Sequence, residues 1–243
     1  MRTYLKAIAA GTAMIALPAV AHAQDLPAEA KERGFFLLPE LHAMAEGERD
    51  AMNAFMNRVR EAGTKSEHKY GAPLKIAILF PSLETSDAWA RLNISMRSRL
   101  EEIGVPYEVT EFMIRPDEHG RQGAQVEQVI GGDFDYAVIG PSEYQVQKNN
   151  ISRLAEAMPT LVMNIVNPFV DTYGTDKQPM THVGFDHTVG AEELCRWVIK
   201  ETGGEGKFAL LRYVPGLIDS QRSDHFAECV TKNSNMELVD AFE

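Results

Sequence analysis

From residue 74 onward, the sequence predicts an α/β fold with a mainly parallel, doubly wound sheet. Short apolar segments alternate there with longer segments of helical periodicity, which is the pattern of repeated strand–helix–strand units. The first apolar segment, LKIAILF at 74–80, is almost continuously apolar, as is typical of a parallel strand buried on both faces. Crossovers between parallel strands are right-handed, so the successive strands form one sheet with helices over its faces.

The same alternation places each element. Strands are expected at 74–80, 105–112, 135–140, 160–165, 182–186, 207–214 and 236–242. Helices are expected after the turn-like 81–87 and up to 103, then at 119–130, 143–157, 187–201 and 220–232. Residues 24–72 precede this pattern and form a helical extension. Its apolar residues near helical spacing are expected to be a packing surface: Leu41, Met44, Met52, Phe55, Met56 and Val59.

The N-terminus predicts export. Arg2 and Lys6 precede an apolar segment of small residues at 7–20, and an A-x-A cleavage signature ends at Ala23. A membrane anchor is the alternative, but a spanning helix needs about 20 apolar residues and this segment is shorter. We therefore expect residues 1–23 to be a signal peptide cleaved after Ala23, and the mature protein to be periplasmic.

Charge and cysteine content exclude several classes of protein. The formal net charge of −11 argues against binding to nucleic acid or to anionic lipid. Cys195 and Cys229 are too few for a disulfide scaffold and lack metal-ligand spacing, so no metal is expected. Export permits a disulfide between them, but two buried free thiols are the preferred interpretation.

The expected ligand site lies where strands end. Doubly wound sheets bind ligands at the carboxyl ends of their strands. The loops there are 81–87, 140–143, 164–170 and 215–220. They contain or adjoin Ser86, Trp89, Asn164 and Arg222. An aromatic face with hydroxyl, amide and guanidinium groups suits a small polyhydroxylated ligand.

Enzymatic function is not expected. The sequence contains no nucleophile elbow, zinc-protease motif, phosphate-binding loop or dinucleotide fingerprint. Ser86 and Asp87 with the distant His187 could be taken for a hydrolase triad, but a chain of this size contains such a set by chance. A sugar-responsive repressor shares the core fold, yet export excludes DNA binding. We expect no catalytic residue and no cofactor.

Residues 74–243 resemble the type I periplasmic binding proteins, and within them the LuxP group of autoinducer-2 receptors. The segments that carry the resemblance are 86–92, 112–122, 163–168, 182–194 and 217–226, the last two being the most specific. The resemblance implies two doubly wound parallel-sheet lobes. Lobe one would span 73–186, and 187–243 would begin a second, incomplete lobe; we expect the chain to be a fragment of a longer protein.

The resemblance also implies roles for individual residues. Ser86 and Trp89 match a hydroxyl and an indole that face a furanose ligand, and Asn164 matches an amide at a strand end. Arg222 matches an arginine that neutralises a borate ester, which agrees with the affinity of a guanidinium for anionic, oxygen-rich groups.

Two positions depart from the pattern of the LuxP group. Glu84 stands where the group has a glutamine, and Gly140 stands where it has a threonine. A carboxylate beside an anionic borate is repulsive, so a neutral sugar is the alternative ligand.

The resemblance implies a membrane partner as well. The ligand would close two lobes, and an inner-membrane sensor histidine kinase would recognise the closed form. An ABC importer permease is the alternative partner. The protein alone is expected to be a monomer.

Overall fold

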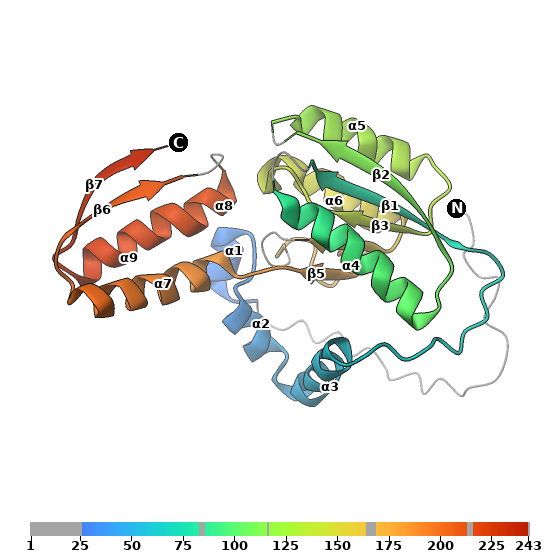
Figure 1. Ribbon diagram of the computed structural model, residues 1–243, viewed down its shortest axis with the longest axis horizontal. Helices are drawn as coiled ribbons and strands as arrows, with labels where there is room; N and C mark the ends of the chain where they lie inside the picture. Colours follow the sequence, from blue (N-terminus) through green and yellow to red (C-terminus); the bar gives the residue numbers. More distant parts are fainter. Residues whose placement is uncertain (1–25, 83–85, 116, 164–168, 213–215, 243) are drawn as a thin grey trace.

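The computed structural model describes residues 26–82, 86–115, 117–163, 169–212 and 216–242. The predicted signal peptide lies outside the described residues. Figure 1 shows two bodies, each built on its own sheet and joined by the segment that follows β5.

The first body contains a five-stranded, all-parallel sheet. Its strands are β1 (Leu74–Pro81), β2 (Tyr107–Ile114), β3 (Tyr136–Ile139), β4 (Thr160–Met163) and β5 (Thr181–Val183). They lie in the order β2-β1-β3-β4-β5, so the direction of winding reverses between β1 and β3. The predicted doubly wound parallel sheet is confirmed.

Helices cover both faces of this sheet. They are α4 (Asp87–Ile103), α5 (His119–Ile130) and α6 (Tyr144–Ala157). Ile76, Ile78 and Phe80 of β1 pack in one cluster with apolar residues of α4, whereas Ala77 and Leu79 pack with those of α5 and α6. Side chains alternate between the faces of a strand, so a strand covered on both sides must be apolar throughout.

The second body is smaller. Its elements are α7 (His187–Thr202), β6 (Lys207–Leu211), α8 (Leu217–Asp219), the π-helical turn η2 (Ser220–Asp224), α9 (His225–Asn233) and β7 (Glu237–Phe242). β6 and β7 pair in parallel, and α7 and α9 lie along the same side of them (Figure 1). Every described residue of β7 is exposed, and the Leu211 side chain at the end of β6 is 87% exposed.

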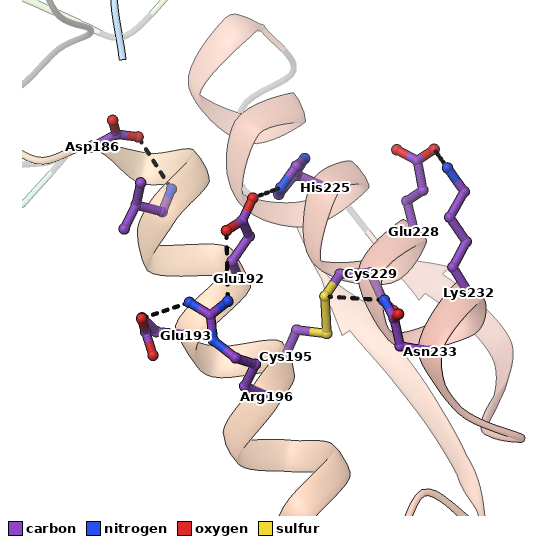
Figure 2. A network of polar contacts seen from close by, with 11 residues as sticks. Asp186, Glu192, Glu193, Cys195, Arg196, His225, Glu228, Cys229, Lys232 and Asn233 are labelled. Carbon is purple, nitrogen blue, oxygen red and sulfur yellow. Dashed lines mark hydrogen bonds and ion pairs between the residues drawn. A yellow bond between two sulfur atoms is a disulfide. The ribbon is translucent and has the colours of Figure 1, made fainter. Parts of the chain in front are cut away.

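The expectation of two free thiols is wrong. Cys195 of α7 and Cys229 of α9 form a disulfide, with their Cα atoms 6.1 Å apart (Figure 2). The two helices pack side by side and place the two cysteines opposite each other, next to the buried Val230 and Met236. The sequence shows that each cysteine lies on a helix but not that the two helices share this face.

Helices make up much of the described part of the N-terminal extension. It contains α1 (Ala28–Arg33), α2 (Leu38–Met44), the 3₁₀ turn η1 (Glu46–Glu48) and α3 (Arg49–Arg60). Its first part is anchored to the rest of the protein: Phe35 forms a β-bridge with Phe169, and the Leu38 amide donates to Asp186 Oδ2 at 2.8 Å.

The expected packing surface of the extension is only partly buried. Phe55, Met56 and Val59 on α3 are 70%, 45% and 58% exposed. These three side chains of α3 are therefore largely exposed. Helical spacing alone does not establish that a face is covered.

Candidate functional site

The carboxyl ends of β1 and β3 define the candidate site in the first body. The strand order reverses between these two strands, so the loops that follow them diverge toward opposite faces and leave a crevice. Ser86 begins α4 after β1, and the segment Gly140–Glu143 follows β3.

Ser86 and Trp89 lie on the first turn of α4. The Ser86 Oγ accepts a hydrogen bond from the Ala88 amide at 3.1 Å, which satisfies one amide at the helix N-terminus. The Trp89 side chain is 7% exposed and its ring centroid lies 5.0 Å from that of Phe80. Trp89 therefore belongs to the core of this body as well as to the edge of the site.

Gly140 leaves room for the Trp89 indole. A Cβ atom added at Gly140 would lie 2.3 Å from Trp89 Cζ3, closer than any two carbon atoms in contact. Any side chain here would displace the indole. The Trp89 indole can therefore be buried at this depth only because residue 140 has no side chain.

A cavity of about 450 Å³ opens beside Trp89, at the ends of β1 and β2. Its polar lining includes Ser82, Glu118 and Arg121. The Glu118 carboxylate accepts hydrogen bonds from the Arg115 amide and from Arg121, and these bonds hold the pKa of Glu118 below its usual value. The cavity therefore offers an apolar indole wall and an ionised, hydrogen-bonded rim.

A buried polar network supports the loop after β3. The Gln122 amide donates to the Gly140 carbonyl at 3.1 Å and accepts from the Ser142 amide at 2.8 Å. Ser142 Oγ lies 2.8 Å from His119 Nδ1, and Gln147 donates to Ser142 Oγ at 3.3 Å. The two glutamines are fully buried, so this network fixes the loop conformation.

Glu143 links the two bodies. Its Oε2 accepts from the Val146 amide at 2.9 Å, at the start of α6, and its Oε1 accepts from the Leu217 amide at 3.3 Å, at the start of α8. One carboxylate thus binds the N-termini of two helices, where it is electrostatically favoured. Gly216 lies against this carboxylate and has a φ of 155°.

Arg222 lies in the π-helical turn η2 of the second body. Its Nε donates to His187 Nδ1 at 3.2 Å. π-Helical turns are rare and are frequent at functional sites. Burial and, to a lesser extent, the neighbouring positive charge of Arg222 lower the pKa of His187 to about 4, so the imidazole is neutral at pH 7.

A second arginine, Arg212, is neutralised within the structure. It donates to Asp219 at 2.9 Å and to Asp224 at 2.7 Å, and these contacts raise its pKa. Arg222 donates its hydrogen bond to a neutral acceptor, and the Asp219 carboxylate acts on it only through its charge. Of these two guanidinium groups, Arg222 is therefore the one without a hydrogen-bonded carboxylate.

The sequence matches no family model. A D-fucose-bound ABC transporter solute binding protein from Agrobacterium vitis is similar in structure, with a TM-score of 0.59 and 18% identity over 69% of this chain and 57% of that protein. A carbohydrate transporter solute binding protein from Agrobacterium radiobacter, in complex with D-arabinose, has a TM-score of 0.57 and 19% identity, over 71% of this chain and 58% of that protein. The fructose binding periplasmic domain of a hybrid two component system has a TM-score of 0.56 and 15% identity, over 70% of this chain and 54% of that protein.

This chain has the type I periplasmic-binding-protein fold. It spans between half and two thirds of the length of these three proteins. At such identities the likeness establishes the fold, while the narrower resemblance to autoinducer-2 receptors remains a prediction.

Within this binding-protein fold the predicted site residues divide between the two bodies. Ser86 and Trp89 lie together on α4, whereas Arg222 lies in the second body. No contact between described residues joins Arg222 to either of them. Glu84 and Asn164 lie outside the described residues, so their roles remain predictions.

Several residues of the site were not predicted. These are His119, Gln122 and Gln147 of α5 and α6, which converge on Ser142 in the expected ligand loop 140–143. The fully buried Gln122 and Gln147 lie on helices, where the sequence resembles an ordinary solvent-exposed face. The signal in the sequence that could have identified these two glutamines is a polar residue on the apolar face of an amphipathic helix.

The described residues contain no group of three or more histidine, cysteine or carboxylate side chains that could hold a metal ion. Within the same residues, no helix combines the length and apolar character needed to cross a membrane.

Proposed function

We propose that this protein is an exported, non-enzymatic receptor that binds a small furanose-like ligand between its two bodies. The guanidinium of Arg222, held by a neutral histidine and without a hydrogen-bonded carboxylate, is the observation that supports this proposal most directly. A guanidinium with free N–H groups suits vicinal oxygens or an anionic ester. The sugars bound by similar proteins, D-fucose and D-arabinose, are of the same chemical class.

Arg222→Ala tests the proposal. A hydrogen bond to a charged group contributes about 1.5–3 kcal/mol, so the substitution should weaken binding by roughly ten- to a hundredfold. Titration calorimetry with autoinducer-2, D-fucose and D-arabinose measures the affinity. Arg196→Ala, an equal change of charge on the exposed face of α7, should leave the affinity unchanged. Equal affinities of wild type and Arg222→Ala would contradict the assigned role.

The specific ligand that we propose is autoinducer-2, and Glu84 distinguishes its borate ester from a neutral sugar. If the ligand carries borate, Glu84→Gln removes a repulsion and should tighten binding, and boric acid should raise the affinity. If the ligand is a neutral sugar that donates to the carboxylate, Glu84→Gln should weaken binding and boric acid should have no effect.

Absence of catalysis is part of the proposal. The Ser142 hydroxyl lies 2.8 Å from the His119 ring, yet no described carboxylate is bound to His119 as the third member of a triad. Incubation with sugars, esters or peptides should give binding without turnover. Turnover abolished by Ser142→Ala or Ser86→Ala would establish a hydrolase instead.

An inner-membrane sensor histidine kinase is the proposed partner, and an ABC permease is the alternative. The similar proteins include both a sensor's periplasmic domain and subunits of ABC transporters. Deletion of the gene separates the two: loss of uptake of labelled ligand indicates an importer, whereas a lost transcriptional response with intact uptake indicates a sensor.

Periplasmic location is proposed with cleavage after Ala23. Mass spectrometry of protein released from the periplasm should find Gln24 as its first residue. An intact Met1 on protein recovered from the cytoplasm would contradict export.

A further inference from the structure

His187 occupies an unusual position for a histidine. It is the first residue of α7, directly after the segment that joins the two bodies, and its side chain is 7% exposed. Its Nδ1 accepts from Arg222 Nε, and its Nε2 is buried with no hydrogen-bond partner among the described residues. The imidazole therefore has a single polar contact, and that contact is to Arg222.

The chemistry of this contact fixes the state of the ring. Arginine has only donors, so His187 Nδ1 must be unprotonated and the proton must reside on Nε2. Two charged groups face the ring: Arg222, which opposes protonation, and Asp186, which favours it. Burial adds to the effect of Arg222, and the ring remains a neutral acceptor.

Arg222 and Arg212 differ in their hydrogen-bond acceptors, because that of Arg222 is neutral and those of Arg212 are carboxylates. Arg212 donates through both Nε and Nη2 to carboxylates, so its charge and its geometry are both satisfied within the protein. Arg222 uses only Nε, and its Nη groups have no partner among the described residues. The edge of the guanidinium that could form a paired contact with a ligand is therefore free.

We propose that His187 is a positioning residue for ligand binding. It holds the Arg222 guanidinium by its Nε edge and leaves the Nη edge, which has no hydrogen-bonded carboxylate among the described residues, for an oxygen-rich ligand. It also lies at the start of α7, so it places that ligand beside the segment that joins the two bodies. A carboxylate at the same place would orient Arg222 equally well but would neutralise it. The inference rests on the proposed function, because it assigns His187 to the same site.

Three substitutions at His187 separate orientation from charge. Asn places its Oδ1 where the ring has Nδ1, so His187→Asn should keep the affinity for autoinducer-2, D-fucose or D-arabinose within about twofold. His187→Phe keeps the ring without the acceptor and should weaken binding by about two- to tenfold. His187→Asp keeps the acceptor but adds a negative charge, so it should bind more weakly than its isostere His187→Asn.

A double-mutant cycle shows whether His187 acts through Arg222. In the Arg222→Ala background, His187→Phe should cause no further loss of affinity, because the side chain that it positions is absent. Additive losses would overturn the proposal. Melting temperatures of all variants identify losses that arise from unfolding.

Nitrogen NMR of the full chain tests the arrangement without any ligand. At pH 7, His187 should have a proton on Nε2 and none on Nδ1, and His187→Phe should make the Arg222 Nε–H signal exchange faster with water. A proton on Nδ1 would overturn the positioning role even if sugars bind. If the NMR result holds but wild type binds none of the three compounds, the proposed ligand class fails and the His187–Arg222 arrangement stands.

Discussion

Three residues in this protein have properties set by their immediate neighbours. Gly140 leaves space that the Trp89 indole fills. His182 and His187 are neutral because they are buried. Burial lowers the pKa of His182 and of His187 to about 4 in each case. Each of these features is a consequence of packing and can be tested by a single substitution.

Gly140→Ala should destabilise the protein. The new Cβ would lie 2.3 Å from Trp89 Cζ3, so the buried indole must move, and overpacking of this kind costs about 1–3 kcal/mol. Urea denaturation measures the free energy of unfolding. Gly190→Ala is the matched control, because a Cβ there meets no atom within 4 Å and an alanine within a helix is neutral or stabilising. Equal stability of wild type and Gly140→Ala would show that Trp89 is not held as described.

Stability should fall as the pH is lowered from about 6.5 toward 4. The unfolded chain protonates its histidines near pH 6.5, whereas folded His182 and His187 resist protonation until about pH 4. Between these values the unfolded state binds more protons, so each histidine reduces the free energy of unfolding by up to about 1.4 kcal/mol per pH unit. Above pH 6.5 this contribution is fully present.

His182→Phe isolates this effect from the titration of carboxylates. The variant retains a buried ring that cannot be protonated, so its stability should depend less steeply on pH between 4 and 6.5 than that of wild type. Urea denaturation of both proteins at several pH values provides the comparison. Identical slopes would mean that His182 is accessible to protons in the folded state.

At the scale of elements, one covalent bond joins α7 and α9. Figure 2 shows the disulfide between ion pairs of both helices, such as Glu228 with Lys232 and Glu193 with Arg196. These ion pairs are exposed and contribute little to stability. Because β7 is wholly exposed and this body has a small core, we attribute much of its stability to the disulfide.

Replacing both cysteines by serine should therefore lower the stability of this body. The bond closes a loop with a sequence separation of 34 residues, for which the chain-entropy account gives about 3–4 kcal/mol. Urea denaturation of the double variant measures the loss, and a thiol reductant should destabilise wild type comparably while leaving the variant unchanged. A wild type that is insensitive to reduction under denaturing conditions would contradict the bond.

At the scale of the whole molecule, Glu143 is the described side chain that hydrogen-bonds across from the first body to the second. It binds amides at the starts of α6 and α8 together, beside Leu217 and Ile218 of α8, which pack against the apolar core of the first body. A contact of this kind is easily broken, which suits a fold that opens and closes around a ligand.

Glu143→Ala should loosen the two bodies and cost about 1 kcal/mol through loss of the α6 cap. Small-angle scattering should report a larger radius of gyration for the variant than for wild type. Glu118→Ala removes a carboxylate that bonds only within the first body and should leave the radius unchanged. Superimposable scattering of Glu143→Ala and wild type would show that the carboxylate does not hold the bodies together.

The sequence alone was sufficient for the order of elements and for the doubly wound sheet. Apolar strands buried on both faces and amphipathic helices have distinct periodicities, and both are local properties of the chain. The strand at 74–80 and the helix at 119–130 were predicted to within a residue of the observed limits. The same logic placed Ser86 and Trp89 beside a strand end, and their role in ligand binding stays a prediction. The boundary between the bodies, predicted at 186/187, stays a prediction.

Only the tertiary structure decided which distant residues meet. The disulfide depends on how α7 faces α9, and the depth of Trp89 depends on Gly140 in another strand–loop unit. The neutral state of His187 depends on its burial and, to a lesser extent, on Arg222, 35 residues away. Periodicity tells which side of an element is apolar, but not which element covers it or which polar atoms become partners. Those pairings arise from packing between elements, and at the candidate site they determine the charge, the depth and the orientation of each group.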